Sequence, residues 1–447
     1  MTTGLDIRAS DNLQPVSISF KSGGDRLIVL GIFNAILRIL SLGLYSFWAK
    51  TEVRKRLWSF TRIDGEPLEY TGTGKELFLG FLIVFAAFIL PLMAAGIAVA
   101  LLFRSYSAAL PLYQGAVYLL IFLLIGNAMY RAQRYRLSRT RWRGIRGALT
   151  GSPARYGWAY FWTLALPAVL VIALSFVISV AVGPQVGGAI VLLGIVLALW
   201  VLPWRANKLQ GMMTNDMHFG DRPLSYTGTA GPLYKRYLYA WLGSALVYLA
   251  AIGATAVYVI RSGALINWQM AKIPPTLVDI LTLAAIWIVA LFVIAVLTAW
   301  YRASQYRHFA GHTHFEGATF AIDATGPSLM WVVVTNWLMQ VLALILGFAA
   351  GTALLILIGP APETEAATDA AAMAAREPGL LATISVLVPI VLFTTVAATF
   401  AQFRWTRYFV SRLKLNGAID LGRVLQGQDQ RLKRGEGLAQ VFDLDAF

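Results

Sequence analysis

The chain has 447 residues, of which 58% are hydrophobic and 13% are charged, and its mean hydropathy is +0.65. Soluble domains are about half apolar and about a quarter charged, so this composition excludes an ordinary soluble protein. The absence of cysteine excludes disulfides, thiolate metal sites and thiol catalysis. We therefore expect a polytopic membrane protein.

The first apolar run covers 22 residues, from Leu27 to Trp48, after a polar N-terminal stretch. That stretch lacks the basic start, apolar centre and cleavage site of a signal peptide, so we expect nothing to be removed. One helix of this length would reach about 33 Å and cross a membrane once, which places the N-terminus outside. A break at Gly43 would instead give a short re-entrant hairpin with both ends inside. The single crossing is favoured because lipid-exposed irregular backbone is costly.

Nine apolar runs in all are long enough to cross a bilayer core as helices. They lie near residues 27–48, 77–103, 109–129, 157–182, 187–204, 238–260, 277–300, 328–358 and 380–402. The pattern predicts an all-α polytopic membrane protein with about nine transmembrane helices.

The formal net charge of +15 is distributed unevenly. Five segments contain 29 of the 37 Lys and Arg residues, whereas the four alternate connections contain 4. The basic segments are 48–75, 127–156, 204–236, 300–327 and 403–447. This asymmetry follows the positive-inside rule and predicts that the basic segments and the C-terminus lie in the cytoplasm. Nucleic acid is not needed to explain the charge, and we expect no binding to it.

The stretch from Trp48 to Gly74 recurs along the chain. Its Tyr70-Thr71-Gly72-Thr73 aligns without a gap with Tyr226-Thr227-Gly228-Thr229. Copies begin at Tyr130, Trp204, Trp300 and Phe403. Such a period indicates one structural module repeated within a single membrane domain. The modules cover about 18–67, 68–146, 147–223, 224–319 and 320–423, and 424–447 forms a cytoplasmic tail.

Each copy starts with an aromatic residue and a cation, where an apolar run ends. Such pairs are typical of the membrane interface, because the ring lies at headgroup depth and the cation extends toward lipid phosphate. The predicted anchors are Trp48, Lys50, Tyr130, Arg131, Trp204, Arg205, Trp300, Arg302, Phe403 and Arg404. We expect these segments to contact the bilayer and its anionic headgroups at the cytoplasmic face.

The second half of each copy contains a glycine between short alternating segments, which is typical of a β-hairpin turn. The turn glycines are Gly65, Gly144, Gly220, Gly317 and Gly417. The repeat therefore predicts small cytoplasmic β-hairpins after alternate helices. Isolated hairpins are marginal in water, so we expect them to pair with one another or to pack on helix ends.

Two possible ligand motifs fail on inspection. The segment Gly72–Glu76 resembles the end of a phosphate loop. That motif would need Gly at position 69 and Ser or Thr at position 76, and both positions are Glu. The weak metal candidates His308, His312 and His314 have no standard ligand spacing. We expect no metal and no cofactor.

Polar residues within two apolar runs indicate a functional site or a partner more strongly, since a charge or amide at membrane depth is costly. Asn34 with Arg38, and Asn336 with Gln340, are i, i+4 pairs, so each pair shares a helix face. When Phe20 is aligned with Ile322, Asn34 falls on Asn336. These four residues are the candidate midplane site. The alternative is that they form hydrogen bonds between packed helices, or that Arg38 snorkels to the membrane interface.

The segments SLGLYSFWAK at 41–50 and TRIDGEPLEYTGT at 61–73 resemble the YjgN-like family of bacterial inner-membrane proteins, whose domain is of unknown function. Leu57-Trp58 stands where the family has an Arg-Tyr-aromatic run. The resemblance implies a multi-pass protein of the bacterial inner membrane and supplies no catalytic residues.

The leading functional hypothesis is a transporter or channel-like protein for a small solute or lipid, because repeats and buried polar groups are typical of transporters. The alternative is a non-catalytic scaffold whose basic hairpins bind anionic lipid or a cytoplasmic partner. We do not expect an enzyme, since the sequence has no clustered acids, nucleophiles or standard metal spacing.

Overall fold

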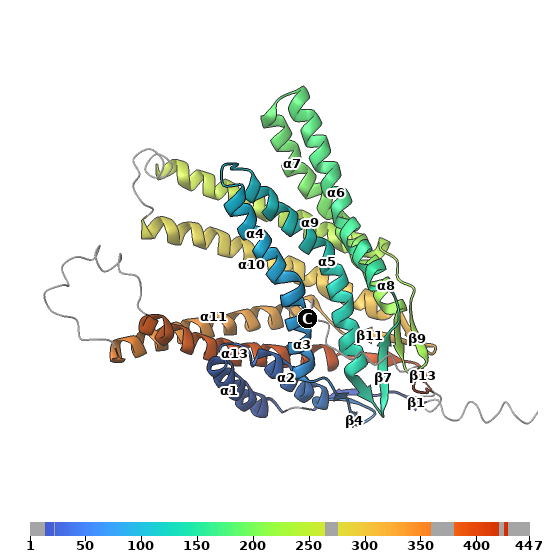
Figure 1. Ribbon diagram of the computed structural model, residues 1–447. Helices are drawn as coiled ribbons and strands as arrows, with labels where there is room; N and C mark the ends of the chain where they lie inside the picture. The colour runs from blue at the N-terminus through green and yellow to red at the C-terminus, as the bar shows by residue number, and fades with distance from the viewer. Residues whose placement is uncertain (1–13, 22, 264–275, 359–379, 420–423, 428–447) are drawn as a thin grey trace, which may run out of the picture.

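The computed structural model describes residues 14–21, 23–263, 276–358, 380–419 and 424–427 (Figure 1). The helices are α1 (Gly24–Leu40), α2 (Ser46–Phe60), α3 (Gly74–Val84), η2 (Phe85–Ile89), α4 (Leu90–Leu102), α5 (Ala109–Arg139), α6 (Pro153–Ala181), α7 (Pro184–Ala198), η3 (Leu199–Val201), α8 (Leu202–Asn215), α9 (Gly231–Arg261), α10 (Leu277–Gly311), α11 (Gly326–Ile358) and α13 (Leu380–Val410). Mostly helical structure was predicted from the apolar runs and is present.

Seven helices in the described residues are long and apolar enough to cross a membrane, two fewer than the nine predicted. They are the continuous helix 74–102 and α5, α6, α9, α10, α11 and α13. The predicted run 187–204 is divided between α7, η3 and the start of α8. The predicted run 27–48 is divided between α1 and α2.

The single crossing predicted for residues 27–48 is wrong. The chain reverses at Leu42 and Gly43, which have positive φ angles of 51° and 91°. The amide of Gly43 donates a hydrogen bond to the carbonyl of Arg38 at 2.7 Å, and neighbouring amides in the turn are also paired. This pairing removes the backbone cost that favoured a straight helix. The break at Gly43, the alternative reading, is what the structure has.

Short strands form a layer at one end of the helices. They are β1 (Gln14–Pro15), β2 (Ile18–Phe20), β3 (Thr61–Ile63), β4 (Glu66–Pro67), β5 (Glu69–Tyr70), β6 (Thr140–Trp142), β7 (Ile145–Leu149), β8 (Met217–Phe219), β9 (Arg222–Tyr226), β10 (Thr313–Phe315), β11 (Ala318–Ile322), β12 (Leu413–Asn416) and β13 (Ala418–Ile419). The strand orders are β12-β11-β10-β9-β8-β7-β6-β5, β2-β3-β4 and β1-β13, and all pairs are antiparallel.

Four of the predicted turns connect strands that pair with each other: β3 with β4, β6 with β7, β8 with β9 and β10 with β11. The fifth, at Gly417, does not close a hairpin. There β12 pairs with β11, and β13 pairs with β1 instead. The first and last described strands therefore lie together, on the same side of the helices.

Large apolar side chains just before the turns form a core for the β layer. The indole of Trp142 donates a hydrogen bond to the carbonyl of Ile63 at 3.2 Å. Its ring lies 6.0 Å from that of Phe219, which lies 6.1 Å from that of Phe315. Val424 of the C-terminal segment is buried in the same core. Strands from different modules are thus joined by side-chain packing as well as by backbone pairing.

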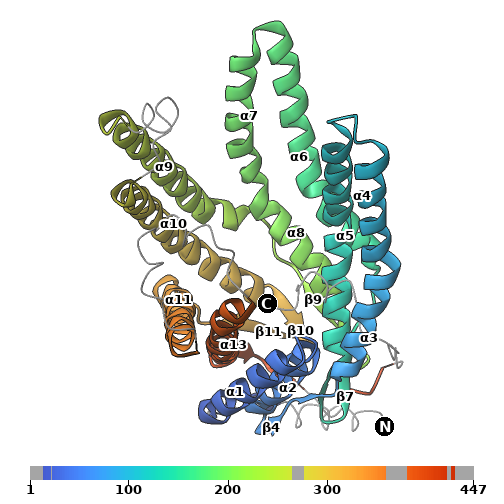
Figure 2. The ribbon, with the colours of Figure 1, turned by 60° about the vertical axis from the view of Figure 1, so that its left-hand side comes forward.

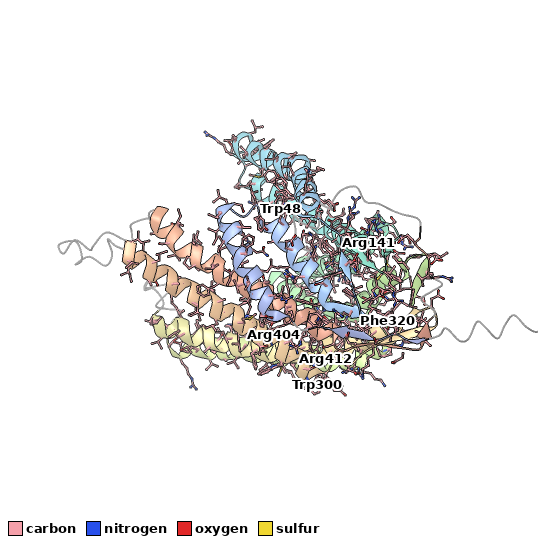
Figure 3. All side chains as sticks on the ribbon, turned by 90° about the horizontal axis from the view of Figure 1, so that it is seen from below. Trp48, Arg141, Trp300, Phe320, Arg404 and Arg412 are labelled. Atoms are coloured by element: carbon pink, nitrogen blue, oxygen red, sulfur yellow. The ribbon has the colours of Figure 1, made fainter. Side chains whose placement is uncertain are left out.

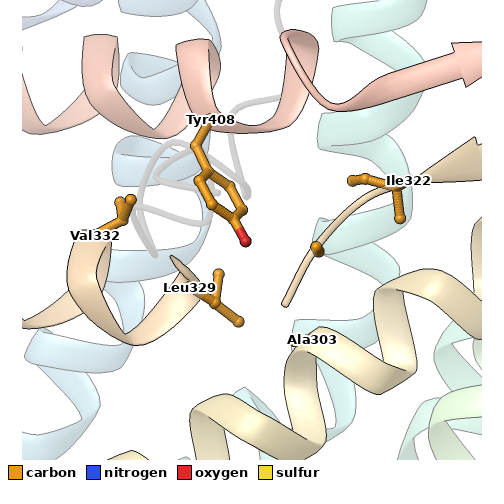
Figure 4. Packing of buried hydrophobic residues seen from close by; sticks show 6 residues of the cluster. Ala303, Ile322, Leu329, Val332 and Tyr408 are labelled. Atoms are coloured by element: carbon orange, nitrogen blue, oxygen red, sulfur yellow. The ribbon is translucent and has the colours of Figure 1, made fainter. Parts of the chain in front are cut away.

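The helices rise from the β layer as pairs that diverge with distance from it (Figures 1 and 2). Neighbouring modules contact each other through α2 and α3, α5 and α6, α8 and α9, and α10 and α11. The last module returns to the first through α13 and α1. Near the β layer, Ala303, Leu329 and Tyr408 bring α10, α11 and α13 together in a buried cluster (Figure 4). The modules thus form a closed cycle of contacts.

Candidate functional site

The two predicted asparagines are buried in helices that belong to different modules. Asn34 on α1 is 1% exposed, and Asn336 on α11 is 6% exposed. The nitrogen and oxygen of both amides lack a hydrogen-bond partner among the described residues. A buried polar group without a hydrogen bond costs about 1–3 kcal/mol. A ligand or a water molecule that hydrogen-bonds to these amides would therefore be favoured.

Their sequence partners are less buried. Arg38 is exposed, and its Nη1 lies 3.5 Å from Oγ1 of Thr395 on α13. Gln340 is half-buried on α11. The i, i+4 spacing therefore places a more accessible polar group one turn from each buried amide.

Helix α13 packs against both α1 and α11. On the α1 side, Gly31 lies so close that an added Cβ would be 3.4 Å from the Cα of Val396. The amides of Asn34 and Asn336 do not hydrogen-bond to each other, since both lack partners. The two amides thus lie on helices that pack against the same third helix, and the single midplane site that would unite all four residues stays a prediction.

The anchor positions of α5, α10 and α13 lie within these long helices, whereas Trp48 and Trp204 lie near the starts of α2 and α8. Tyr130 is fully buried and Phe403 is 4% exposed, so these two aromatic residues are not in contact with headgroups, contrary to the prediction. The reason is that α5 and α13 continue to Arg139 and Val410, where neighbouring modules cover them. Trp204 and Trp300 are 41% and 64% exposed and stay compatible with an interface.

Several of the predicted anchor cations contact the protein. Nε of Arg205 donates to Oγ1 of Thr163 at 3.0 Å, and Arg404 donates to the hydroxyl of Thr335. Nε of Arg131 donates to Oδ1 of Asn127 at 2.8 Å. Figure 3 labels Trp48, Trp300 and Arg404, which lie on α2, α10 and α13. Lys50 and Arg302, the other two cations, lie on α2 and α10.

A repeated contact that was not predicted joins the end of one helix to the segment before another. Arg134 donates to the carbonyl of Gly151, and Arg307 donates to the carbonyl of Ala324, each 17 residues further along the chain. The equal spacing in two modules is the signal that could have revealed it. These arginines hold the connection between a β-hairpin and the next helix.

His312 and His314 have hydrogen-bond partners within the protein. Nδ1 of His314 lies 3.1 Å from Oγ1 of Thr319, and Nε2 lies 3.0 Å from Oγ1 of Thr227. The rings of His308 and His312 are 4.3 Å apart, and Nδ1 of His312 faces the carbonyl of His308. Within the described part of the chain, no group of three His, Cys, Asp or Glu residues is placed to bind a metal ion.

One tyrosine of the β layer has a clearly altered acidity. Burial raises the pKa of Tyr226 to about 12. Its hydroxyl donates to Oδ1 of Asn207 at 2.6 Å, and Nδ2 of Asn207 donates to the carbonyl of Gly228. Asn207 thus holds the segment before α9, much as the arginines do in other modules. The pair has a structural role.

Residues 15–441 match the family described as "Bacterial protein of unknown function (DUF898)". The chain belongs to this family. Among curated relatives, inner membrane protein YjgN of Salmonella typhimurium strain LT2 is 26% identical over 186 residues, which is 40% of this chain and 43% of the relative. YjgN of Escherichia coli strain K12 is 25% identical over 183 residues, which is 40% of this chain and 42% of the relative.

The resemblance to the YjgN-like family is therefore confirmed. The match spans less than half the length of each of these relatives. Their names place those proteins in an inner membrane, and this DUF898 member has several helices apolar enough to span one. No solved structure matches the chain.

Proposed function

We propose that this DUF898 protein is a transporter or channel-like protein for a small solute or lipid. The observation that carries the proposal is the pair of buried, unpartnered amides of Asn34 and Asn336. A transported species or the water around it would supply the missing hydrogen bonds at membrane depth. The closed cycle of helix pairs also supports it, since transport sites in repeat-built folds lie between repeats.

The scaffold alternative receives less support from the basic segments. Arg139 forms an ion pair with Glu76 at 3.0 Å, and Arg143 forms one with Glu66 at 2.9 Å. Arg134 donates to the carbonyl of Gly151. Cations with partners inside the protein have fewer hydrogen bonds to offer to lipid or to a partner protein. We propose no catalytic step for the described residues.

The absence of native cysteine gives a direct test. Asn34→Cys and Asn336→Cys should react with a small charged thiosulfonate, both in intact cells and in inverted membrane vesicles. Transport requires that the site open to each side in turn or to both at once. The matched controls are Ala35→Cys and Ala343→Cys, which are buried in the same two helices at 0% and 7% exposure and should react slowly.

Two results would contradict the proposal. The first is reaction at Asn34→Cys and Asn336→Cys no faster than at the alanine controls, because positions that water does not reach cannot line a transport path. The second is reaction from one face of the membrane only. Gel filtration of each variant in detergent checks that the chain stays folded.

A further inference from the structure

A cavity of about 540 Å³ lies between α9 and α10, away from α1 and α13. The two helices run side by side from the β layer (Figure 2). Arg236, Ser304 and Arg307 line one part of the cavity, and Ala240 and Leu297 line another. Leu297 and Arg307 are ten positions apart on α10, which corresponds to about 15 Å along the helix axis. The cavity thus joins an apolar part to a cationic part.

Both arginines lack an acidic partner in the part of the chain that the structure describes. Nη1 of Arg236 donates to Oγ of Ser304 at 3.0 Å, and Nη1 of Arg307 donates to the carbonyl of Ala324. Each guanidinium carries five N–H donors, so donors are left over. Two cations that face one cavity without a counter-ion favour an anionic ligand, and guanidinium groups match phosphate oxygens well.

Tyr301 supplies a second, independent indication. Its side chain lines the cavity and is 8% exposed, yet its hydroxyl has no hydrogen-bond partner among the described residues. Buried hydroxyls in folded proteins are nearly always paired. An anionic oxygen in the cavity would accept this hydrogen bond.

The repeat shows that the charge at residue 236 is specific to this module. When Trp48 is aligned with Trp204, Arg236 falls on Gly80. When Trp48 is aligned with Trp300, Val332 falls on the same Gly80. Packing of the module does not need a cation here, because other copies have Gly or Val. Arg236 lies near the start of α9 and has no acidic partner among the described residues, so its charge favours an anionic ligand over a role in the fold.

The apolar part of the cavity indicates what carries the anion. Tyr239 and Trp300 line this part, and their side chains are 77% and 64% exposed. The cavity is therefore open to the outer surface of the helices at these two rings. Aromatic rings of this kind favour the boundary between headgroups and acyl chains. A free phosphate ion would leave the Leu297 side of the cavity without a partner. A lipid fills both parts.

We propose that this cavity binds the phosphate group of an anionic membrane phospholipid, with Arg236, Arg307, Ser304 and Tyr301 around the phosphate and an acyl chain beside Leu297 and Tyr239. The site does not depend on the transport proposal, since Asn34 and Asn336 lie on other helices.

The test uses the purified full chain in nanodiscs of phosphatidylcholine with or without phosphatidylglycerol, and native mass spectrometry to count retained lipid. The wild-type chain should retain phosphatidylglycerol in preference to phosphatidylcholine. Arg236→Gln should weaken this retention about tenfold, the size expected for loss of a charge-assisted hydrogen bond. Arg261→Gln is the matched control, because it removes the same charge from the other end of α9 and should have no effect.

Tyr301→Phe keeps the test decisive even if the arginine variant does not fold. It removes only a hydroxyl without a partner, so it should leave the melting temperature unchanged and still reduce phosphatidylglycerol retention.

Equal retention of the two lipids by the wild-type chain would overturn the proposal. Equal losses in Arg236→Gln and Arg261→Gln would overturn it as well, because they would indicate diffuse attraction to the surface. Thermal stabilisation by inorganic phosphate alone, as large as that by the lipid, would replace the lipid with a free anion.

Discussion

The hydroxyl of Tyr130 on α5 donates a hydrogen bond to Oδ2 of Asp216 at 2.8 Å, where α8 ends. Arg155 at the start of α6 donates to Oδ1 of the same carboxylate at 2.7 Å. Both Tyr130 and Asp216 are buried. One carboxylate at the end of α8 thus binds both α5 and the start of α6.

Asp216→Ala should lower the free energy of unfolding by about 1–3 kcal/mol, because it leaves the hydroxyl of Tyr130 buried without a partner. Tyr130→Phe should cost about 1 kcal/mol, since only one hydrogen bond is lost. Thermal melting in one detergent measures both. The control is Glu66→Gln, which breaks an exposed ion pair with Arg143 and should cost about 0–1 kcal/mol. A loss in Glu66→Gln as large as that in Asp216→Ala would contradict the assignment.

The turn at Arg143 and Gly144 has positive φ at both residues, 49° and 78°. Gly144→Ala should destabilise the protein by about 1–2 kcal/mol, because an L side chain is strained in this conformation. Gly115→Ala is the contrasting variant, since Gly115 lies in α5 and an added Cβ meets nothing within 4 Å. It should stabilise the helix by up to about 1 kcal/mol. The two melting temperatures should therefore move in opposite directions, and movement in the same direction would contradict the turn geometry.

The pairing of β2 with β3 predicts the membrane topology of the first module. Ser19 and Arg62 are register partners in these strands, and Glu66 follows in β4. Ser19→Cys and Glu66→Cys should therefore react with an impermeant thiol reagent from the same side of the membrane. Ser105→Cys, between α4 and α5, should react from the opposite side. Labelling of Ser19→Cys and Glu66→Cys from opposite sides would contradict the reversal at Gly43 and support a single membrane crossing by residues 27–48.

Local features of the β layer could be predicted because they depend on a few adjacent residues. Asp64-Gly65 and Glu316-Gly317 have the composition of tight hairpin turns, and all four residues have positive φ. The repeat then extended this prediction to less obvious copies such as Arg143-Gly144. Alignment of the first and last modules also predicted equivalent helix positions for Asn34 and Asn336, and both residues are buried.

Pairing over long distances could not be predicted in the same way. The partner of β13 is β1, about 400 residues away in sequence, and not the adjacent β12. After the reversal at Gly43, β3 pairs with β2, so the chain returns to the layer from which α1 starts. Gly43 indicated a possible break, but the strand pairs that place both ends of 27–48 at the β layer are made by backbone groups distant in sequence.

The sequence by itself determined the class of protein and the turns, and it predicted the repeated module, because hydropathy, glycine conformation and periodicity act over short stretches of chain. Only the tertiary structure decided which strands pair, that Tyr130 and Phe403 are core residues, and that Arg236 and Arg307 face one cavity beside Tyr301. These outcomes depend on which modules become neighbours. Neighbours are selected by packing and hydrogen bonding over the whole chain, so no single copy of the repeat contains that information.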